Sequence, residues 1–511
     1  MFRSFLTVSS GTLASRLLGF VRDSVIAALL GAGPVADAFL AAFQLVNVVR
    51  RLLSEGGLNA ALVPAWLKVR DRDGDAAARA FAGRVLGTVS AAVIVAALVI
   101  GVVMPLVIAA IAPGFVGRDT LQFAVDNARL MLPYLAFAGP VTVMMALLNA
   151  EGRFVLTAFS PLLFNIALIS VMAVLLLRQQ EAVQAALVMA ATIGVAGLLQ
   201  LSMLALRGAS LASPLRISFD PEMRGFLGRA IPGMVASSAP QWLIVAGAVI
   251  ASTSPSAVSW LYFANRLLEL PLGIVGVAMG SVLIPEMTRA VRSGESSAIA
   301  RAESRALELA AGLTLPATLG LMLLSGPIVR MLFEHGAFTA EDTAATAQAL
   351  IWLTLALPAH VLVKALSPAF FAREDTLTPL FATLKAIVVA ITAAFLLGHI
   401  FGASGIAAGI ALGAWSNALS LIRKGAASFG FSIDADARRR LPRILAAALA
   451  MGVLLWLAAG ALPAGSHGFV QAAALLTLIA AGIAGYGLFL QLFGVTGWRE
   501  AVNAVRQRRP A

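Results

Sequence analysis

The stretch from Asp37 to Pro64, DAFLAAFQLVNVVRRLLSEGGLNAALVP, has the length and apolar content of a membrane-spanning helix, yet it carries an arginine pair. A related stretch, SWLYFANRLLELPLGIVGVAMGSVLIP, runs from Ser259 to Pro285, so the closing prolines lie 221 residues apart. A second pair, AEGRFVLTAF (Ala150–Phe159) and AREDTLTPLF (Ala372–Phe381), repeats with an offset of 222. Two matches at nearly one offset predict a duplicated half-molecule, which is typical of transporters that bind substrate between their halves.

The composition places the chain in a membrane. Of its residues, 60% are hydrophobic and 12% charged, and the mean hydropathy is +0.92. A soluble domain carries about 25% charged residues, so this chain lacks the polar surface to cover a globule in water. It has no cysteine, which excludes disulfides and thiol chemistry. The net charge of +12 does not indicate nucleic-acid binding, because the basic residues cluster in the short gaps between apolar runs.

The apolar runs predict an all-α polytopic membrane protein with about fourteen spans, since a spanning helix needs about 20 mainly apolar residues. The runs lie near residues 8–30, 35–55, 82–111, 124–149, 157–177, 183–206, 228–252, 258–285, 305–326, 345–371, 378–398, 403–422, 441–462 and 469–493. The first, second and eighth are the least hydrophobic. Arg16 and Arg22 interrupt the first run, which argues against a cleavable signal peptide.

The placement of Lys and Arg predicts the orientation. Basic residues concentrate in segments on the same side as the N-terminus, such as 68–84, 423–443 and 499–509, and they are sparse on the other side. Positive charge in short loops marks the cytoplasmic face, so we expect both termini to be cytoplasmic. Most of these residues serve topology and contact with anionic membrane lipids.

Seven basic residues fall inside the apolar runs instead. They are Arg16, Arg22, Arg50, Arg51, Arg266, Lys364 and Lys385. An arginine at mid-membrane costs roughly 2.5 kcal/mol or more, so it normally faces a watery cavity or a charged partner. Arg22 beside Asp23, and Arg266 three residues before Glu269, are also placed to form internal ion pairs. Lys364 and Lys385 can snorkel to a helix end.

Helical geometry groups several of these side chains. At about 100° per residue, five polar side chains of the second span fall within one narrow arc. They are Asp37, Gln44, Asn47, Arg51 and Glu55. Lipid does not tolerate such a stripe, so it must face protein or water. In the first span, Arg16 and Asp23 are seven residues apart and share a face, whereas Arg22 is displaced around the helix.

A cavity lined by arginines suits a di- or polyanionic head group, because the guanidinium fork matches phosphate and carboxylate. Nothing in the sequence indicates an enzyme: there is no GxxxxGK[ST] loop for ATP, and the four histidines show no metal spacing. We therefore expect no cofactor and no metal. Four acids in the spans are equally suited to carry protons or to act as counter-charges: Asp23, Asp37, Glu55 and Glu269.

Four blocks resemble a known family: SRLLGFVRD (Ser15–Asp23), GAGPVADAFLAAF (Gly31–Phe43), NVVRRLLSEGGLNAALVP (Asn47–Pro64) and NRLLELPLGIVGVAMGSVLIP (Asn265–Pro285). They resemble the MurJ (MviN) lipid II flippases of the MATE-like MOP exporter superfamily. The resemblance runs from about residue 3 to 494. It implies fourteen helices, two pseudo-two-fold-related six-helix lobes, a V-shaped central cavity, and two C-terminal helices that form a groove for a lipid tail.

The resemblance also implies a domain division. The expected parts are an N-lobe (1–206), a cytoplasmic linker (207–227), a C-lobe (228–424), two helices forming the lipid-tail groove (425–494) and a basic tail (495–511). The implied cargo is lipid II, undecaprenyl-pyrophosphoryl-MurNAc-pentapeptide-GlcNAc, moved across the cytoplasmic membrane of a bacterium.

Site residues carry over position by position. The family's cavity arginines match Arg16, Arg22, Arg50 and Arg266, and its acids match Asp23, Asp37, Glu55 and Glu269, with Lys364 as a further candidate for coupling or counter-charge. The stripe geometry favours Arg51 over Arg50; the family usually has a proline at Val46, which would change the phase of the helix. Asn265 stands where many members have Asp, which weakens a proton role there. The runs 228–252 and 378–398 contain no Asp, Glu or Asn, so the sodium site of some members is not expected.

Two alternatives stay open beside the flippase. One is a related exporter of another polyprenyl-linked saccharide or of a drug-like cation, although a cation pump should line its cavity with acids and aromatics. The other is a non-transporting scaffold for wall synthesis, which would need neither repeated halves nor buried charges. The expected partners are lipid II, membrane lipids and a cell-wall synthesis complex, with no nucleic acid.

Overall fold

The structure is a computed structural model of the full chain. It describes residues 2–54, 57–237, 239–278, 289, 295–371, 373, 375, 377–429, 434–460 and 468–495. By its internal contacts the chain divides into two compact units. The first comprises Met1–Ser259 and His335–Thr339, and the second comprises Trp260–Glu334 and Ala340–Ala511.

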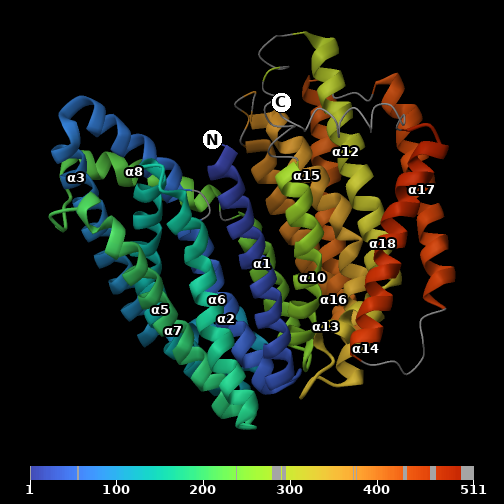
Figure 1. The fold of residues 1–511 in the computed structure, drawn as a ribbon, viewed down its shortest axis with the longest axis horizontal. Coiled ribbons are helices and arrows are strands. Elements are labelled where there is room, and N and C mark those ends of the chain that lie inside the picture. Colours follow the sequence, from blue (N-terminus) through green and yellow to red (C-terminus); the bar gives the residue numbers. More distant parts are fainter. Residues whose placement is uncertain are drawn as a thin grey trace. The chain divides into compact units, whose positions relative to one another are not determined.

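The first unit is built from helices. In chain order they are α1 (Phe2–Leu30), α2 (Pro34–Ser54), α3 (Gly57–Val102), α4 (Met104–Ile111), the 3-10 turn η1 (Pro113–Phe115), α5 (Asp119–Ala150), α6 (Phe154–Leu177), α7 (Ala182–Gly208), the 3-10 turn η2 (Ala209–Leu211), α8 (Pro221–Ser237) and α9 (Ala239–Ala251). Within the unit, α5 packs against α2, α3 and α7, and α1 packs against α6 (Figure 1). The long helix α5 is therefore the centre of this unit.

One core cluster of this unit joins α3, α5, α7 and α8. Phe81 of α3 meets Phe226 of α8 edge to face, with ring centroids 6.0 Å apart. Leu147 and Leu148 of α5 and Trp66 of α3 are buried in the same cluster. Edge-to-face aromatic pairs stabilise by about 0.5–1.5 kcal/mol beyond the buried area. This packing fixes α8 on the first unit.

A short loop from much later in the chain completes the first unit. The N–H of Ala337 donates to the carbonyl oxygen of Ala28 at 2.8 Å. Gly31 ends α1 with φ +64°, a conformation that favours glycine, and a Cβ there would lie 2.5 Å from the Ala337 oxygen. This close approach explains why residues 335–339 belong to the first unit.

The second unit is also helical. Its helices are α10 (Ala257–Ala278, whose first three residues belong to the first unit), α12 (Ser296–Leu323), α13 (Ser325–Phe333), α14 (Ala340–Thr354), α15 (Ala356–Phe371), α16 (Leu377–Phe429), α17 (Ala435–Ala459) and α18 (Phe469–Leu492). Here α12 packs against α15 and α17, and α17 packs against α18 (Figure 1). The Tyr486 hydroxyl of α18 donates to the Gly312 carbonyl of α12 at 2.8 Å.

The element α16 is two helices joined at Gly402, where φ is +57° and ψ −136°. Its halves fold back on each other through small residues. A Cβ at Gly409 would lie 2.3 Å from the Ala394 nitrogen, and one at Gly413 would lie 2.5 Å from the Ala390 Cβ. Small residues allow helix backbones to approach closely inside a membrane. The structure thus agrees with the sequence prediction of separate spans at 378–398 and 403–422.

The structure confirms the all-α membrane class. Nine helices among the described residues are long and apolar enough to cross a membrane. The helices α1, α2 and α10, which cover the predicted first, second and eighth spans, are not among these nine. They are the spans that carry the membrane-depth arginines. The number fourteen and the division into two six-helix lobes with boundaries at 206 and 228 stay predictions.

The two echoed stretches are only partly described. Residues 37–54 and 57–64 lie in α2 and α3, and residues 259–278 lie in α10. The remainder of the second stretch, to Pro285, lies outside the described residues.

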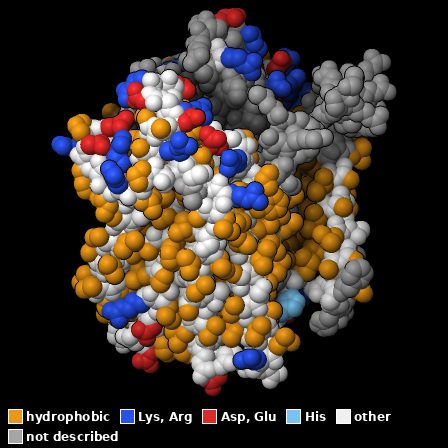
Figure 2. Space-filling model, turned by 60° about the vertical axis from the view of Figure 1, so that its left-hand side comes forward, with side chains coloured by type: hydrophobic (Ala, Val, Ile, Leu, Met, Phe, Trp, Pro, Cys, Tyr) orange, Lys and Arg blue, Asp and Glu red, His pale blue; other side chains and the backbone are white. Residues whose placement is uncertain are grey.

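One face of the protein shows where lipid lies. Figure 2 shows hydrophobic side chains covering the middle of this face, with Lys, Arg, Asp and Glu gathered towards its two ends. Exposed side chains such as Ile94, Val95 and Leu98 of α3 belong to the apolar surface. A surface of this kind is stable only in contact with hydrocarbon.

Candidate functional site

Arg22 and Asp23 form a buried ion pair in α1. Arg22 donates to the same Asp23 oxygen, Oδ1, from Nε at 2.9 Å and from Nη2 at 2.7 Å. The Arg22 side chain is 10% exposed and the Asp23 side chain 0%. A buried arginine needs both a counter-charge and further hydrogen bonds, because desolvating two charges is costly. The sequence placed these residues side by side, and the structure confirms that they pair.

Other helices of the first unit enclose this pair. Arg22 Nη1 donates to Asn165 Oδ1 of α6 at 3.1 Å, and Asn165 Nδ2 in turn donates to the Ser15 carbonyl at 3.2 Å. The guanidinium lies over the ring of Phe43 at 5.0 Å and near that of Phe164 at 5.9 Å. Cation–π contact strengthens when water is excluded. Arg22 is therefore held in one place by charge, amide and aromatic groups.

Arg50 of α2 shares one electrostatic partner with Arg22. Both Arg22 and Arg50 interact electrostatically with the buried Tyr134 of α5. The Tyr134 ring packs edge to face on Phe164, with centroids 5.4 Å apart. Two arginines that are distant in the sequence are thus brought towards one buried aromatic residue.

Arg16 lies in a different environment from Arg22. Its side chain is exposed, as are those of Leu13 and Leu17 on the same part of α1. By contrast, Asp23 is fully buried, so the predicted shared face of Arg16 and Asp23 does not give them equal burial. Helix angle alone does not decide exposure, because the later turns of α1, around Ile26, are covered by neighbouring helices whereas the turn at Arg16 is not.

Four of the five residues in the predicted polar stripe of α2 are described, and all four are buried or half-buried, which agrees with a face directed towards protein or water. Asp37 is buried, and Gln44, Asn47 and Arg51 are half-buried. Gln44 helps to line a small, mostly apolar cavity inside the first unit, together with residues of α4 and α9 such as Ile111 and Ala248. The fifth member of the stripe, Glu55, lies outside the described residues.

Asp37 binds the first turn of α10. Its Oδ1 accepts hydrogen bonds from the Ser259 backbone N–H at 2.9 Å and from the Ser259 hydroxyl at 2.5 Å. The two residues are 222 positions apart and both belong to the first unit. A carboxylate at a helix N-terminus is stabilised by the unpaired N–H groups and the helix dipole. Asp37 therefore acts as the cap of α10, a role that the sequence did not reveal.

Replacing Asp37 with alanine is expected to lower stability by about 1–2 kcal/mol, because the first turn of α10 loses a charged acceptor. The expected readout is a lower apparent melting temperature of the purified protein in detergent. Ser259→Ala removes only the hydroxyl donor and should have the smaller effect. Equal melting temperatures for Asp37→Ala and the parent protein would contradict the capping role.

The second unit has its own arginine–carboxylate pair. Arg266 Nη1 donates to Glu269 Oε2 at 2.7 Å, three residues apart on α10, and both side chains are partly exposed. Lys364 of α15 is exposed. Lys385 of α16 is also exposed and donates to the Ser420 hydroxyl at 3.4 Å. The pairing of Arg266 with Glu269, which their spacing predicted, is confirmed.

The comparisons with known proteins give the family. A family model described as lipid II flippase MurJ matches residues 26–475. A probable lipid II flippase MurJ of Rhizobium meliloti (strain 1021) is 37% identical, over 97% of this chain and 94% of its own length. One from Rhizobium tropici is 35% identical, over 100% and 98%. The chain belongs to the MurJ family.

The fold agrees with this membership. A solved structure of the lipid II flippase MurJ in an inward closed conformation aligns with a TM-score of 0.79 at 22% identity, covering 96% of this chain and 98% of the other. A multidrug-resistance MATE transporter of the MOP superfamily, in an inward-facing conformation, aligns with a TM-score of 0.65 at 16% identity, over 86% and 98%. The fold of this MurJ-family protein is thus the one shared with MATE-like transporters.

Several residues around the charged groups of this MurJ-family protein were not found by sequence reasoning. Asn165 could have been noticed, because it is an amide inside an apolar run (FSPLLFNIALIS). Ser259 and Tyr134 carry no such signal. In the part of the chain that the structure describes, no group of three or more His, Cys, Asp or Glu residues is placed to hold a metal ion.

Proposed function

We infer that this protein is a lipid II flippase. It moves undecaprenyl-pyrophosphoryl-MurNAc-pentapeptide-GlcNAc from the inner to the outer leaflet of the bacterial cytoplasmic membrane, for peptidoglycan synthesis. The observation that carries this inference is membership of the MurJ family over nearly the whole chain. The membrane-depth arginines fit the pyrophosphate of this lipid, because each guanidinium offers a fork of donors that matches phosphate oxygens.

We propose that Arg16, Arg22 and Arg266, with Arg50 or Arg51, bind the pyrophosphate and head group in one central cavity. Asp23 and Glu269 are counter-charges, since each is bonded to one of these arginines. They hold Arg22 and Arg266 in position when no lipid is bound, and the pyrophosphate then competes for the same donors. Asp37, Glu55 and Lys364 are proposed to take part in coupling or in balancing charge.

The protein translocates its substrate by alternating access and catalyses no covalent step. In this proposal both termini face the cytoplasm, and the lipid tail follows the groove formed by α17 and α18. Other proteins of cell-wall synthesis are proposed as partners. The alternative cargo, a drug-like cation, is disfavoured because the candidate site is formed by arginines, which repel it.

The experiment that tests the function is depletion of the protein in its native bacterium. Lipid-linked wall precursors are then assigned to a leaflet by their access to a membrane-impermeant reagent in intact cells and in inverted vesicles. Lipid II should accumulate on the inner face. Accumulation of a different polyprenyl-linked saccharide, with normal lipid II distribution, would support the alternative exporter instead.

We expect transport to respond to membrane potential or proton gradient without a sodium requirement. The described residues of the runs 228–252 and 378–398 include no Asp, Glu or Asn, which are the ligands that a sodium site needs. Moving one charge through 100 mV is worth about 2.3 kcal/mol, so a basic site can respond to the field directly. Flipping is measured in vesicles with potential, pH gradient and sodium varied separately. Strict dependence on sodium alone would refute this expectation.

A further inference from the structure

The connector between α7 and α8 lies closely against α3. A Cβ at Gly83 would lie 2.2 Å from the Pro214 carbonyl oxygen, and one at Gly87 would lie 2.5 Å from the Arg216 oxygen. The Arg216 N–H also donates to the Gly83 carbonyl at 3.4 Å. Only glycine permits backbone to approach a helix this closely. These two glycines, one helical turn apart, form the groove in which the connector lies.

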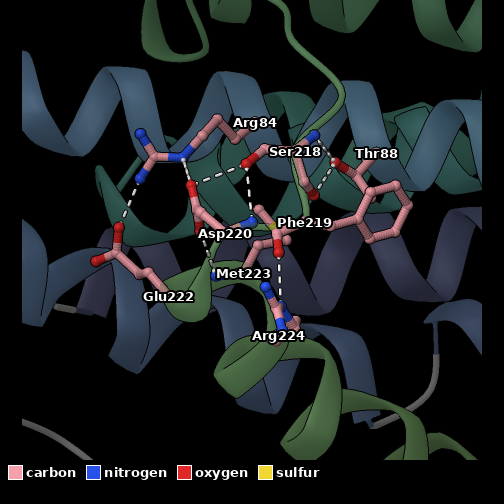
Figure 3. A network of polar contacts seen from close by, with 8 residues as sticks. All are labelled: Arg84, Thr88, Ser218, Phe219, Asp220, Glu222, Met223 and Arg224. Carbon is pink, nitrogen blue, oxygen red and sulfur yellow. Dashed lines mark hydrogen bonds and ion pairs between the residues drawn. The ribbon is translucent and has the colours of Figure 1, made fainter.

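Polar contacts hold the connector in this groove. The Thr88 hydroxyl donates to the Ser218 carbonyl at 3.2 Å and accepts from the Ser218 N–H at 3.0 Å, so it satisfies both backbone groups of that residue (Figure 3). Unpaired backbone groups are costly where water is scarce. Because Thr88 bonds both the N–H and the carbonyl of Ser218, the extended connector can lie beside α3 with these backbone groups paired.

The end of the connector is fixed as well. Asp220 Oδ1 accepts from the Met223 N–H at 2.7 Å and so caps α8, and the Ser218 hydroxyl donates to Asp220 Oδ2 at 2.8 Å. These hydrogen bonds, the one from Met223 above all, keep the pKa of Asp220 below its usual range. Arg84 of α3 bridges Asp220 at 3.3 Å and Glu222 at 2.5 Å (Figure 3).

The opposite side of the connector is apolar. Leu215 and Ile217 are each 64% exposed, and Phe219 is 63% exposed. Alternate residues of an extended chain point the same way, so these three side chains form one row on the same side of the connector. Figure 3 shows the Phe219 ring directed away from the Arg84–Glu222 pair. The backbone of this segment is held against α3, and these three side chains stay exposed on their own unit.

The position of this row indicates what covers it. Gly87 and Thr88, which the connector contacts, lie in the predicted span 82–111, whose exposed side chains Ile94, Val95 and Leu98 continue the apolar surface. Arg216 and Arg224 beside the row are exposed and basic. Apolar side chains flanked by arginines suit a bilayer interface that contains anionic lipid.

We propose that residues 213–220 form a lipid-embedded strap. Leu215, Ile217 and Phe219 lie among the acyl chains of the adjoining leaflet, and Arg216 and Arg224 contact its anionic head groups. The groove at Gly83 and Gly87 of α3 holds the backbone of this segment in place. The partner of this surface is therefore the phospholipid bilayer. The protein contacts it through a segment that connects two helices and not through a spanning helix.

The absence of cysteine allows a direct test in the full-length protein. Leu215→Cys, Ile217→Cys and Phe219→Cys, made singly, are labelled with a nitroxide and reconstituted in phosphatidylethanolamine–phosphatidylglycerol vesicles. We expect each label to be several-fold more accessible to oxygen, relative to a water-soluble nickel chelate, than a control label at Ala76→Cys. Ala76 is exposed on α3 among Asp71, Asp73 and Asp75. Labels at all three positions with the accessibility ratio of the control would overturn the strap.

A second arm tests the arginines separately. In Phe219→Cys the label should report a shallower depth after Arg216→Gln and Arg224→Gln are added, and also when phosphatidylcholine replaces the anionic mixture. An unchanged depth in both comparisons would overturn the proposed head-group contact. A melting temperature equal to that of the unlabelled parent shows that each labelled protein is folded, so a water-exposed label counts against the proposal.

Discussion

Replacing Arg16 with alanine is expected to abolish support of growth in a strain depleted of its own flippase. Arg16 is exposed, and so are its neighbours Leu13 and Leu17, so alanine removes a charge with little loss of packing. If Arg16 contributes donors to the pyrophosphate, its loss removes a charge-assisted hydrogen bond at a site where water is scarce. Such a bond is worth about 1.5–3 kcal/mol, which corresponds to a 10- to 200-fold weaker interaction.

The variant Arg16→Lys tests whether the positive charge alone is enough or whether the shape of the guanidinium is needed. Arg16→Lys keeps the positive charge but cannot form the bidentate fork, so we expect poor rescue of growth. Arg178→Ala is the control, because Arg178 is exposed like Arg16 but lies at the end of α6, outside the proposed site. All three variants are compared by colony formation and by membrane level of the protein. Full growth with Arg16→Ala at normal protein level would remove Arg16 from the site.

Replacing Asp23 with alanine is expected to destabilise the protein and abolish its function. Arg22 then loses the carboxylate that accepts two of its hydrogen bonds, while its guanidinium remains buried beside Phe43 and Phe164. Breaking a buried ion pair by removing one partner typically costs about 3–5 kcal/mol, because the remaining charge is left in a low dielectric. The apparent melting temperature in detergent should fall accordingly.

The double variant Arg22→Leu with Asp23→Ala distinguishes stability from function. Replacing a buried pair with apolar groups is often neutral, so the melting temperature should recover most of its loss. Growth should not recover, because the arginine proposed to bind pyrophosphate is gone. A double variant that regains stability and also supports growth would show that Arg22 has only a structural role. A double variant as unstable as Asp23→Ala would contradict the account of the pair.

The sequence determined the class of the protein and the approximate positions of many of its spans. Hydropathy and the length of apolar runs are local properties, so the membrane class followed from the sequence, as did the two separate spans that meet at Gly402 in α16. Charge pairs within one helix were also predictable. Arg266 and Glu269 are three residues apart, so helical geometry places them on one face. Arg22 and Asp23 are neighbours in the sequence, so the long Arg22 side chain can reach the Asp23 carboxylate.

Only the tertiary structure decided which of these groups are buried and what holds them. Asn165 and Phe164 reach Arg22 from α6, and Ser259 meets Asp37 across 222 residues of chain. The exposure of Arg16 and the burial of Asp23 likewise depend on where neighbouring helices cover α1. The periodicity of one helix gives the direction of a side chain but not the identity of what lies opposite. That identity is set by packing between helices, where hydrogen bonds and contacts form between residues whose separation in the sequence carries no signal.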